Sequence, residues 1–494
     1  MLSKQNKITS SKLFLTVFLV TIMLLSILGR IPAIAIEPPK HYTELEFPPL
    51  PKLELPEYTR FQLDNGIVVY LMEDHELPII SGRALFRTGA RFEPENQVGL
   101  ANLTGIVMRT GGTSQHSSEQ INQLLEQKAA TVETGIGGTN GNGSFSCLTE
   151  DLTKVFGLFT EVIREPIFLE EKLDLAKQQF QGGIARRNDV PESIASREFQ
   201  KLIYGKESPY ARTVEYETLN NISQEDLIDF YGKYFHPENM ILGIVGDFNT
   251  KQMRSLITEQ LGDWQPSSKK VKLRLPKVTQ AEVGNIFFVE QPQVNQSYIQ
   301  IGHLGGKLDN PDYTALSVMN RVMNGLGGRL FNNIRSRQGL SYSVYAYWSA
   351  NYDYPGVFVA NGQTRSDATV SFIQSINKEI ERIRTQPITQ DELKQAKDST
   401  LNSFIFNFQD PSQTLSRLMR YEYYDYPQDF IFRYRQELEK ITVADVQRVA
   451  QKYLQPEKMV ILVVGNEAEI QPPLSSLGDG IEITSIDITI PEPS

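Results

Sequence analysis

The sequence predicts an α+β fold built by tandem duplication of one module of roughly 220 residues. The segment "ISQEDLIDFYGKYFHPENMILGIVG" (222–246) aligns without gaps on "ITVADVQRVAQKYLQPEKMVILVVG" (441–465). Upstream, "RTGARFEPENQVGLANLTGIVMRTGG" (87–112) aligns with "HLGGKLDNPDYTALSVMNRVMNGLGG" (303–328). In each copy strands come first, then helices, then a closing strand. This order predicts a mixed, mainly antiparallel sheet covered by helices.

Length and composition bound the possible functions. The chain has 494 residues, which favours two or more domains. Hydrophobic residues make up 40% and charged residues 22%, as in ordinary globular proteins. The formal net charge of -10 argues against nucleic acid as the main partner. The single cysteine, Cys147, excludes an internal disulfide and a cysteine-based zinc cluster, and we expect it to be buried in a strand.

The N-terminus has the pattern of a secretory signal peptide over residues 1–35. Three lysines precede an apolar run at 13–28, and a small-x-small pattern follows at 33–35. An uncleaved anchor that tethers the protein to a membrane is the alternative. Both predict an extracytoplasmic protein, periplasmic or secreted. Residues 36–57 are rich in Pro and Glu and predict a tether.

The first module is expected over residues 58–264. Asn65-Gly66 is a strong turn signal and predicts a hairpin. Further strands are expected at 78–89 and, as a pair joined by a glycine-rich turn, within 130–151. The helices, recognised by apolar periodicity and caps, are expected at 98–110, 117–129, 151–166, 170–187, 192–204 and 223–235.

The second module is expected over residues 281–470, after a polar, Pro-bearing linker at 265–280. In both copies of the closing segment, a helix begins at a Ser or Thr cap. The helix is broken by Pro and is followed by an apolar strand that ends in Gly. The tail at 471–494 is expected to be extended.

Three segments in order resemble the pitrilysin/insulinase/mitochondrial-processing-peptidase family of zinc metallopeptidases. They are "FQLDNGIVVYLMEDHELPIISGRALFRTGARFEPENQVGLAN", "YGKYFHPENMILGIVGDF" and "GGRLFNNIRSRQGLSYSVYA". The resemblance covers nearly everything from about 58 to 470. It implies the fold of the metallohydrolases similar to mitochondrial processing peptidase.

The metal-binding motif of the family is missing. Active members carry H-x-x-E-H on the first helix, with two His ligands on one helical face and a Glu that polarises water. The matching positions here are Asn102, Gly105 and Ile106. The family's third ligand is a Glu on a later helix, and the matching stretch, 175–187, contains no acid. We therefore expect no catalytic residue, no metal and no cofactor in this chain.

A different zinc site is not supported by the histidines. No two of His41, His75, His116, His236 and His303 lie within helical reach of each other. His116 begins an H-x-x-E pattern that lacks a second His, and the simpler interpretation is a helix start with a Ser cap and an acid in the first turn. His236 is expected at the C-terminal end of a helix.

The second module retains an Arg/Tyr pair. Arg335 and Tyr342 match the pair that, by the resemblance, faces the zinc across a closed chamber. A guanidinium and a phenol can hold a substrate carbonyl and donate to a developing oxyanion. The alternative is a surface ion pair for Arg335 and strand packing for Tyr342. The glycines in "NGLGGRLF" (324–331) favour a helix C-cap and turn over a flexible loop near substrate.

The resemblance implies a role inside a heterodimer, because some peptidases of the family pair a zinc-bearing subunit with one that lacks the motif. The hypothesis is a non-catalytic, substrate-binding subunit of an extracytoplasmic zinc metallopeptidase acting on peptides or unfolded segments. Its partner would be an H-x-x-E-H zinc peptidase subunit, and the zinc would sit in that partner. The alternatives are a purely structural scaffold and a stand-alone peptide-binding homologue. A neighbouring reading frame that encodes H-x-x-E-H would favour the first hypothesis.

Overall fold

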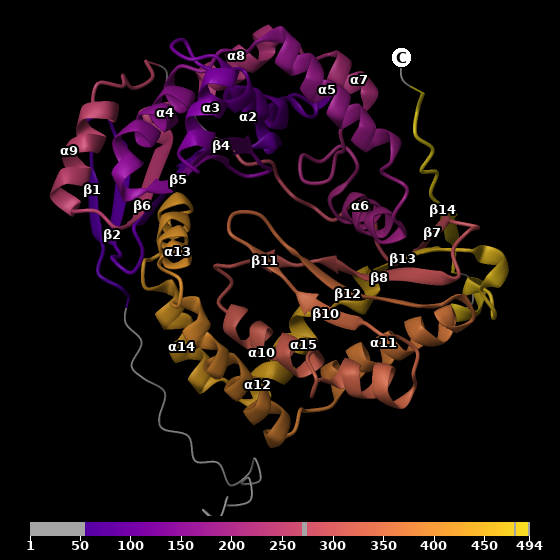
Figure 1. Cartoon of the computed structure of the whole chain (residues 1–494). Helices are drawn as coiled ribbons and strands as arrows, with labels where there is room; N and C mark the ends of the chain where they lie inside the picture. Colours follow the sequence, from indigo (N-terminus) through magenta and orange to yellow (C-terminus); the bar gives the residue numbers. More distant parts are fainter. Residues whose placement is uncertain (1–54, 269–273, 479–480, 493–494) are drawn as a thin grey trace, which may run out of the picture. The chain divides into compact units, whose positions relative to one another are not determined.

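The computed structural model describes residues 55–268, 274–478 and 481–492. The predicted signal peptide and nearly all of the predicted tether lie outside these residues. The predicted α+β fold is confirmed: two six-stranded mixed sheets are each covered by helices (Figure 1). Within the described ranges, no helix is both long and apolar enough to cross a membrane.

The first sheet has the strand order β1-β2-β6-β3-β5-β4. Its strands are β1 (Thr59–Gln62), β2 (Val68–Glu73), β3 (Ile79–Phe86), β4 (Thr131–Ile136), β5 (Gly141–Leu148) and β6 (Met240–Gly246). The predicted hairpin joins β1 to β2, and Gly66 in its turn has φ 101°, which favours glycine. The closing strand β6 lies inside the sheet, parallel to β2 and antiparallel to β3.

The second sheet, with the order β10-β12-β8-β13-β7-β14, repeats five of these strands, but its edge strand β14 pairs in parallel with its neighbour, whereas β1 pairs antiparallel. Its strands are β7 (Ile286–Glu290), β8 (Gln296–Leu304), β10 (Val344–Trp348), β12 (Val357–Arg365), β13 (Val460–Gly465) and β14 (Ile483–Ser485). The closing strand β13 again lies between a parallel and an antiparallel neighbour. A small sheet joins β9 (Gly306–Lys307) to β11 (Ala350–Asn351). The duplication predicted from the repeat is therefore a duplication of sheet topology.

The six helices predicted in the first module are observed, and two further helices, at 216–220 and 250–261, were not predicted. They are α2 (Leu100–Thr110), α3 (Ser118–Gln127), α4 (Leu152–Arg164), α5 (Glu170–Ala185), α6 (Pro191–Tyr204), α7 (Tyr216–Asn220), α8 (Gln224–Tyr234) and α9 (Thr250–Leu261). Those of the second module are α10 (Tyr313–Met323), α11 (Thr369–Thr385), α12 (Gln390–Ser403), α13 (Pro411–Tyr423), α14 (Phe430–Lys440) and α15 (Val443–Tyr453). His236 differs from its prediction, because α8 ends at Tyr234 and His236 precedes a separate short turn.

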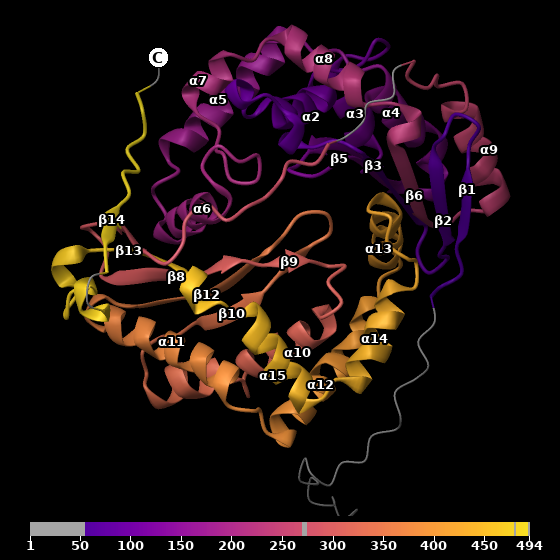
Figure 2. The ribbon, with the colours of Figure 1, turned by 180° about the vertical axis from the view of Figure 1, so that it is seen from behind.

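Two helices pack against the sheet of the other module, which the sequence does not predict. Helix α13 lies on the first sheet, where Leu415 and Met419 share an apolar cluster with β2 and β6 (Figures 1 and 2). Helix α6 lies on the second sheet, where Ile194 and Phe199 pack with β7 and β13. A Cβ atom at Gly243 of β6 would lie 2.3 Å from the Met419 sulfur, so glycine permits this close approach.

A loop of the second module adds a polar contact between the modules. Asp353, in the loop before β12, pairs with Arg91 at 2.8 Å, and the Arg91 side chain is only 3% exposed. On either side of Asp353, Tyr352 stacks on Tyr424 and Tyr354 stacks on Tyr210, with ring centroids 4.6 and 4.1 Å apart. The two modules therefore share half-buried aromatic contacts and an ion pair with a buried arginine, as well as exchanged helices.

The C-terminal tail runs along both modules. Strand β14 pairs in parallel with β7, and beyond it the Asn188 side chain donates to the Ile488 carbonyl at 2.7 Å. Ile490 packs against the apolar core of the first module. The described part of the tail is thus held by backbone pairing at one end and by apolar burial at the other.

Candidate functional site

The zinc-motif positions lie on α2, where packing and hydrogen bonds occupy them. The Asn102 side chain donates to the Ile136 carbonyl of β4 at 2.9 Å. Ile106 packs against the apolar core of the first module. Neither side chain suits zinc, because the amide of Asn102 is a poor ligand and the hydrocarbon side chain of Ile106 has no donor atom.

Gly105 allows α2 to approach β4 more closely than any side chain would permit. A Cβ atom at this position would lie 2.5 Å from the Ile136 backbone nitrogen and 2.7 Å from the Gly135 carbonyl carbon. The Thr134 hydroxyl donates to the Gly105 carbonyl at 2.6 Å, which holds the helix and strand together. A glutamate at this position would therefore meet the backbone of the strand.

The helix that should carry the third ligand offers none. Gly182 and Gly183 of α5 lie in the acid-free stretch, and a Cβ atom at either would meet no heavy atom within 4 Å. Across the described parts of the chain, no group of three or more His, Cys, Asp or Glu side chains could hold a metal ion. The residues at the family's zinc position do not fit the metal.

The histidines make other contacts. His75 bonds to Asp247 at 2.7 Å on the surface, and His116 bonds to Glu161 at 2.7 Å. The predicted Ser cap after His116 is confirmed, because Ser117 accepts from the Gln120 backbone N–H in a capping box. His303 is buried, and burial lowers its pKa.

Side chains of the first helix also cover the edge of the first sheet. The guanidinium of Arg109 donates to the Val132 carbonyl of β4 at 2.6 Å, and burial lowers the pKa of Arg109. Together with Asn102 and Gly105, it places α2 directly along this strand. An exposed edge strand can pair with an extended peptide, and α2 blocks that mode of binding on β4.

The edge of the second sheet is covered in the same way. Asn320 of α10 exchanges two hydrogen bonds with the backbone of Trp348, both at 2.9 Å. Asn324 does the same with Ala346, at 2.6 and 2.9 Å. These two side-chain amides hydrogen-bond to the backbone N–H and C=O groups on the free edge of β10. A peptide therefore cannot add as a strand to this edge and has to be bound by side chains.

The structure brings Arg335 and Tyr342 together. Arg335 lies in a π-helical turn, η6 (Phe331–Arg337), and its guanidinium carbon is 4.4 Å from the Tyr342 ring centroid and 4.8 Å from that of Phe331. Tyr342 is 77% exposed. Arg335 makes no ion pair with any residue that the structure describes, and Tyr342 precedes β10 rather than packing within it. The alternative expected from the sequence, a surface ion pair and a packed tyrosine, is therefore not observed.

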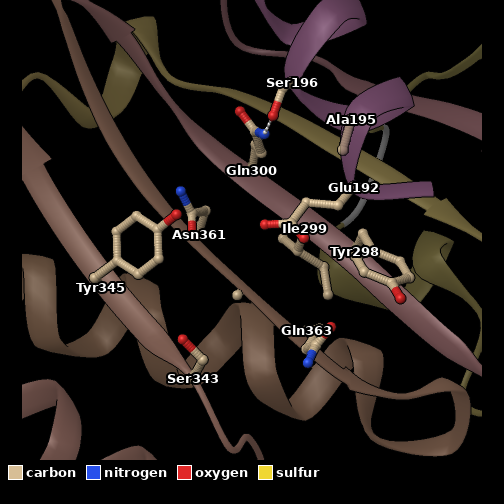
Figure 3. Close-up of a pocket in the computed structure, with 11 residues that line it drawn as sticks. Glu192, Ala195, Ser196, Tyr298, Ile299, Gln300, Ser343, Tyr345, Asn361 and Gln363 are labelled. Carbon is tan, nitrogen blue, oxygen red and sulfur yellow. Dashed lines mark hydrogen bonds between the residues drawn. The ribbon is translucent and has the colours of Figure 1, made fainter. Parts of the chain in front are cut away.

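A polar cavity of about 270 Å³ is lined by residues that lie close to Tyr342 in the sequence, although neither Arg335 nor Tyr342 lines it. Ser343 and Tyr345, the residues that follow Tyr342, line one side of it (Figure 3). The other walls are formed by α6, β8 and β12, with the side chains of Glu192, Ser196, Gln300, Asn361 and Gln363 among the lining. Gln300 donates to the Ser196 hydroxyl at 3.3 Å across the cavity wall.

Sequence reasoning missed this cavity because its walls come from four elements far apart in the chain. The only signal in the sequence is the alternation of polar and apolar residues in β8 and β12, which does not show what lies above the strand. Amide, hydroxyl and carboxylate groups that face open space can hydrogen-bond to the backbone of an extended peptide.

Two family models match the chain. The first, described as insulinase (peptidase family M16), matches residues 69–214. The second, described as the peptidase M16 inactive domain, matches residues 221–400. The chain belongs to the M16 peptidase family. The resemblance seen in the sequence is thereby confirmed.

Similar curated proteins come from bacteria, and one of them is named a non-peptidase homolog. The chain is 22% identical over 406 residues to the non-peptidase homolog YmxG of Helicobacter pylori, covering 81% of this chain and 92% of that protein. It is 21% identical over 360 residues to the uncharacterized zinc protease YmxG of Bacillus subtilis, covering 72% and 86%. Together with the lost zinc motif, these similarities support a non-catalytic M16-like protein.

Solved structures share the fold. An M16 inactive domain from Pseudomonas fluorescens superposes with a TM-score of 0.72 at 25% identity, covering 83% of this chain and 98% of that one. The periplasmic protease PqqL of Escherichia coli superposes with a TM-score of 0.70 at 17% identity, covering 88% of this chain and 49% of that one.

Proposed function

We propose that this M16 chain is a non-catalytic, substrate-binding subunit of a heterodimeric, extracytoplasmic zinc metallopeptidase that acts on peptides or unfolded segments. The observation that carries the proposal is the asymmetry between the two modules. The zinc-motif positions are filled by helix–strand packing, whereas Tyr342 is exposed with the half-buried Arg335 stacked on its ring, and Ser343 next to it in the chain lines an open polar cavity. The partner would be an H-x-x-E-H subunit that holds the zinc.

The chemistry of the pair suits a substrate carbonyl. The guanidinium of Arg335 stacks on the Tyr342 ring, which limits the motion of both groups while leaving the phenol exposed. Such a preorganised pair can donate hydrogen bonds to a carbonyl oxygen and to the oxyanion that develops from it. The polar cavity beside it would hold the peptide on one side of the bond that the partner cleaves.

Location outside the cytoplasm is part of the proposal. The N-terminal pattern of basic residues, apolar run and small-x-small exit supports it, as does the fold shared with a periplasmic protease. An uncleaved N-terminus would tether the complex to a membrane.

A second candidate is a peptide-binding or scaffold homologue with no role in proteolysis. The name of the Helicobacter pylori relative, a non-peptidase homolog, favours this candidate. The two candidates differ in one respect that can be measured: only the first requires the Arg335–Tyr342 pair for cleavage.

The test is steady-state kinetics of the chain reconstituted with its H-x-x-E-H partner. Tyr342→Phe deletes one hydroxyl and keeps the ring, and Arg335→Lys keeps the charge without the planar fork. Such donors act mainly in the transition state, so their loss should change kcat more than KM. We expect kcat to fall roughly 100- to 1,000-fold for one lost donor. The matched control is Tyr58→Phe, which removes a tyrosine hydroxyl next to β1, away from the pair, and should leave kcat unchanged. Near-wild-type kcat in both variants, with assembly intact, would favour the scaffold.

A further inference from the structure

A small cavity between the first sheet and α13 is lined by two arginines. Arg83 of β3 and Arg420 of α13 face this cavity, whose volume is about 190 Å³. Asn140 and Ser416 add polar groups to its lining, and Leu85 adds an apolar one. The walls therefore come from both modules, at a place where α13 crosses the first sheet.

No carboxylate among the described residues neutralises this pair. Arg83 has no hydrogen bond or ion pair with any residue that the structure describes, and Arg420 donates only a long hydrogen bond, 3.4 Å, to the Ser416 carbonyl. The acid near them on α13, Glu422, is already bound by Arg60 at 2.7 Å and by the Tyr70 hydroxyl at 2.7 Å. The two guanidinium groups share a cavity without a counter-ion.

This arrangement is unfavourable for the protein alone. Burial lowers the pKa of Arg83, and the neighbouring charge of Arg420 lowers it further. Carboxylates are not scarce, since the chain has 59 Asp and Glu against 49 Lys and Arg. Both arginine side chains are exposed, so a ligand can reach them from solvent, and two like charges that line one cavity without a carboxylate favour an anionic ligand.

The neighbouring face of α13 shows a similar feature. Arg417 of α13 and Arg321 of α10 line a second cavity, of about 410 Å³, and none of its lining residues is acidic. Arg417 is held by the backbone carbonyl and side-chain oxygen of Asn407 and by no carboxylate. Helix α13 thus presents an arginine to each of two cavities on neighbouring faces.

We propose that the Arg83–Arg420 cavity binds the carboxylate of an acidic side chain in a peptide held by this chain. The inference rests on the proposed peptide-binding function and specifies its substrate class. Guanidinium groups pair with carboxylates through two parallel hydrogen bonds, and the cavity has room for a carboxylate with its short alkyl stem beside Leu85. The peptides preferred by this chain are therefore acidic.

The test compares two pools of acetylated and amidated peptides that carry a neutral dye. Both have random sequences of Ala, Leu, Ser and Gln, but one has a single Glu where the other has Gln. Fluorescence anisotropy with the whole chain should show tighter binding of the Glu pool, by roughly 10- to 100-fold, as for one charged hydrogen-bonded contact.

Variants of the two arginines identify the site. Arg420→Gln and Arg83→Gln should each abolish the preference for Glu while the melting temperature stays the same or rises, because repulsion between like charges is removed. Arg420→Lys should give an intermediate preference. The control Arg365→Gln removes an exposed arginine that pairs with Asp367, and it should change nothing.

The outcomes separate this inference from the proposed function. Equal binding of both pools to the wild-type chain would overturn the inference and leave peptide binding intact. Absence of binding by either pool would refute both. A preference for Glu that survives Arg83→Gln and Arg420→Gln, or a melting temperature that falls in both, would show that these arginines serve another purpose.

Discussion

Replacing Gly105 by alanine tests whether the zinc-motif helix has closed onto β4. The added Cβ atom would lie 2.5, 2.7 and 2.8 Å from three backbone atoms of Ile136 and Gly135. Backbone atoms cannot rotate away, so we expect a cost near the upper end of the range for overpacking, about 3 kcal/mol. Alanine recovers about 1 kcal/mol of helix propensity. The net destabilisation should be about 2 kcal/mol.

The matched control is Gly157→Ala in the middle of α4, where the new Cβ atom would meet no heavy atom within 4 Å. That substitution should stabilise the chain by about 0.5–1 kcal/mol. Thermal unfolding followed by circular dichroism should therefore show Gly105→Ala melting roughly 2–4 °C below wild type, because the two interlocked modules unfold as one large unit. The control should melt slightly above wild type. If Gly105→Ala is as stable as Gly157→Ala, the helix does not lie against the strand as described, and restoring the zinc motif would be sterically possible.

Three further predictions follow from metal content, pH and charge burial. Metal analysis of the dialysed chain should find no stoichiometric zinc, and about one tightly held zinc in the unmodified chain would contradict this. Restoring His, Glu and His at the motif positions should give only a weak zinc site, because the third ligand is absent. His303 has a folded-state pKa below 6.5 because of its burial, so thermal stability should fall as pH drops below 6.5, and less so in His303→Gln. Asp353→Ala should lower the free energy of unfolding by about 3–5 kcal/mol, because it leaves Arg91 buried without its partner. The double variant Arg91→Met/Asp353→Leu should recover most of that loss, and chemical unfolding measures both.

Local signals made much of the fold predictable. The hairpin of β1 and β2 follows from Asn65-Gly66, and the closing strands β6 and β13 follow from a repeat whose caps and apolar runs are local features. The exchange of α6 and α13 between sheets could not be predicted this way. The spacing of Leu415 and Met419 shows that one face of a helix is buried, but it does not show which surface buries it.

The candidate site was predictable only where its residues are close in sequence. Arg335 and Tyr342 belong to one motif, so their proximity could be expected, although their mutual stacking could not. The Arg83–Arg420 cavity depends on a helix that crosses from the other module. The sequence of β3 shows only that Arg83 can point toward solvent. It does not show that Arg420 of α13 lines the same cavity.

The central claim is tested most directly by peptide hydrolysis with the chain alone and with its partner. The partner would be captured from native membranes and periplasm with the tagged chain, and cleavage of an unfolded polypeptide would be followed with and without a zinc chelator. The account predicts no cleavage by the isolated chain and chelator-sensitive cleavage by its complex with an H-x-x-E-H subunit. Robust chelator-sensitive cleavage by the isolated chain, with contaminating protease excluded, would contradict it.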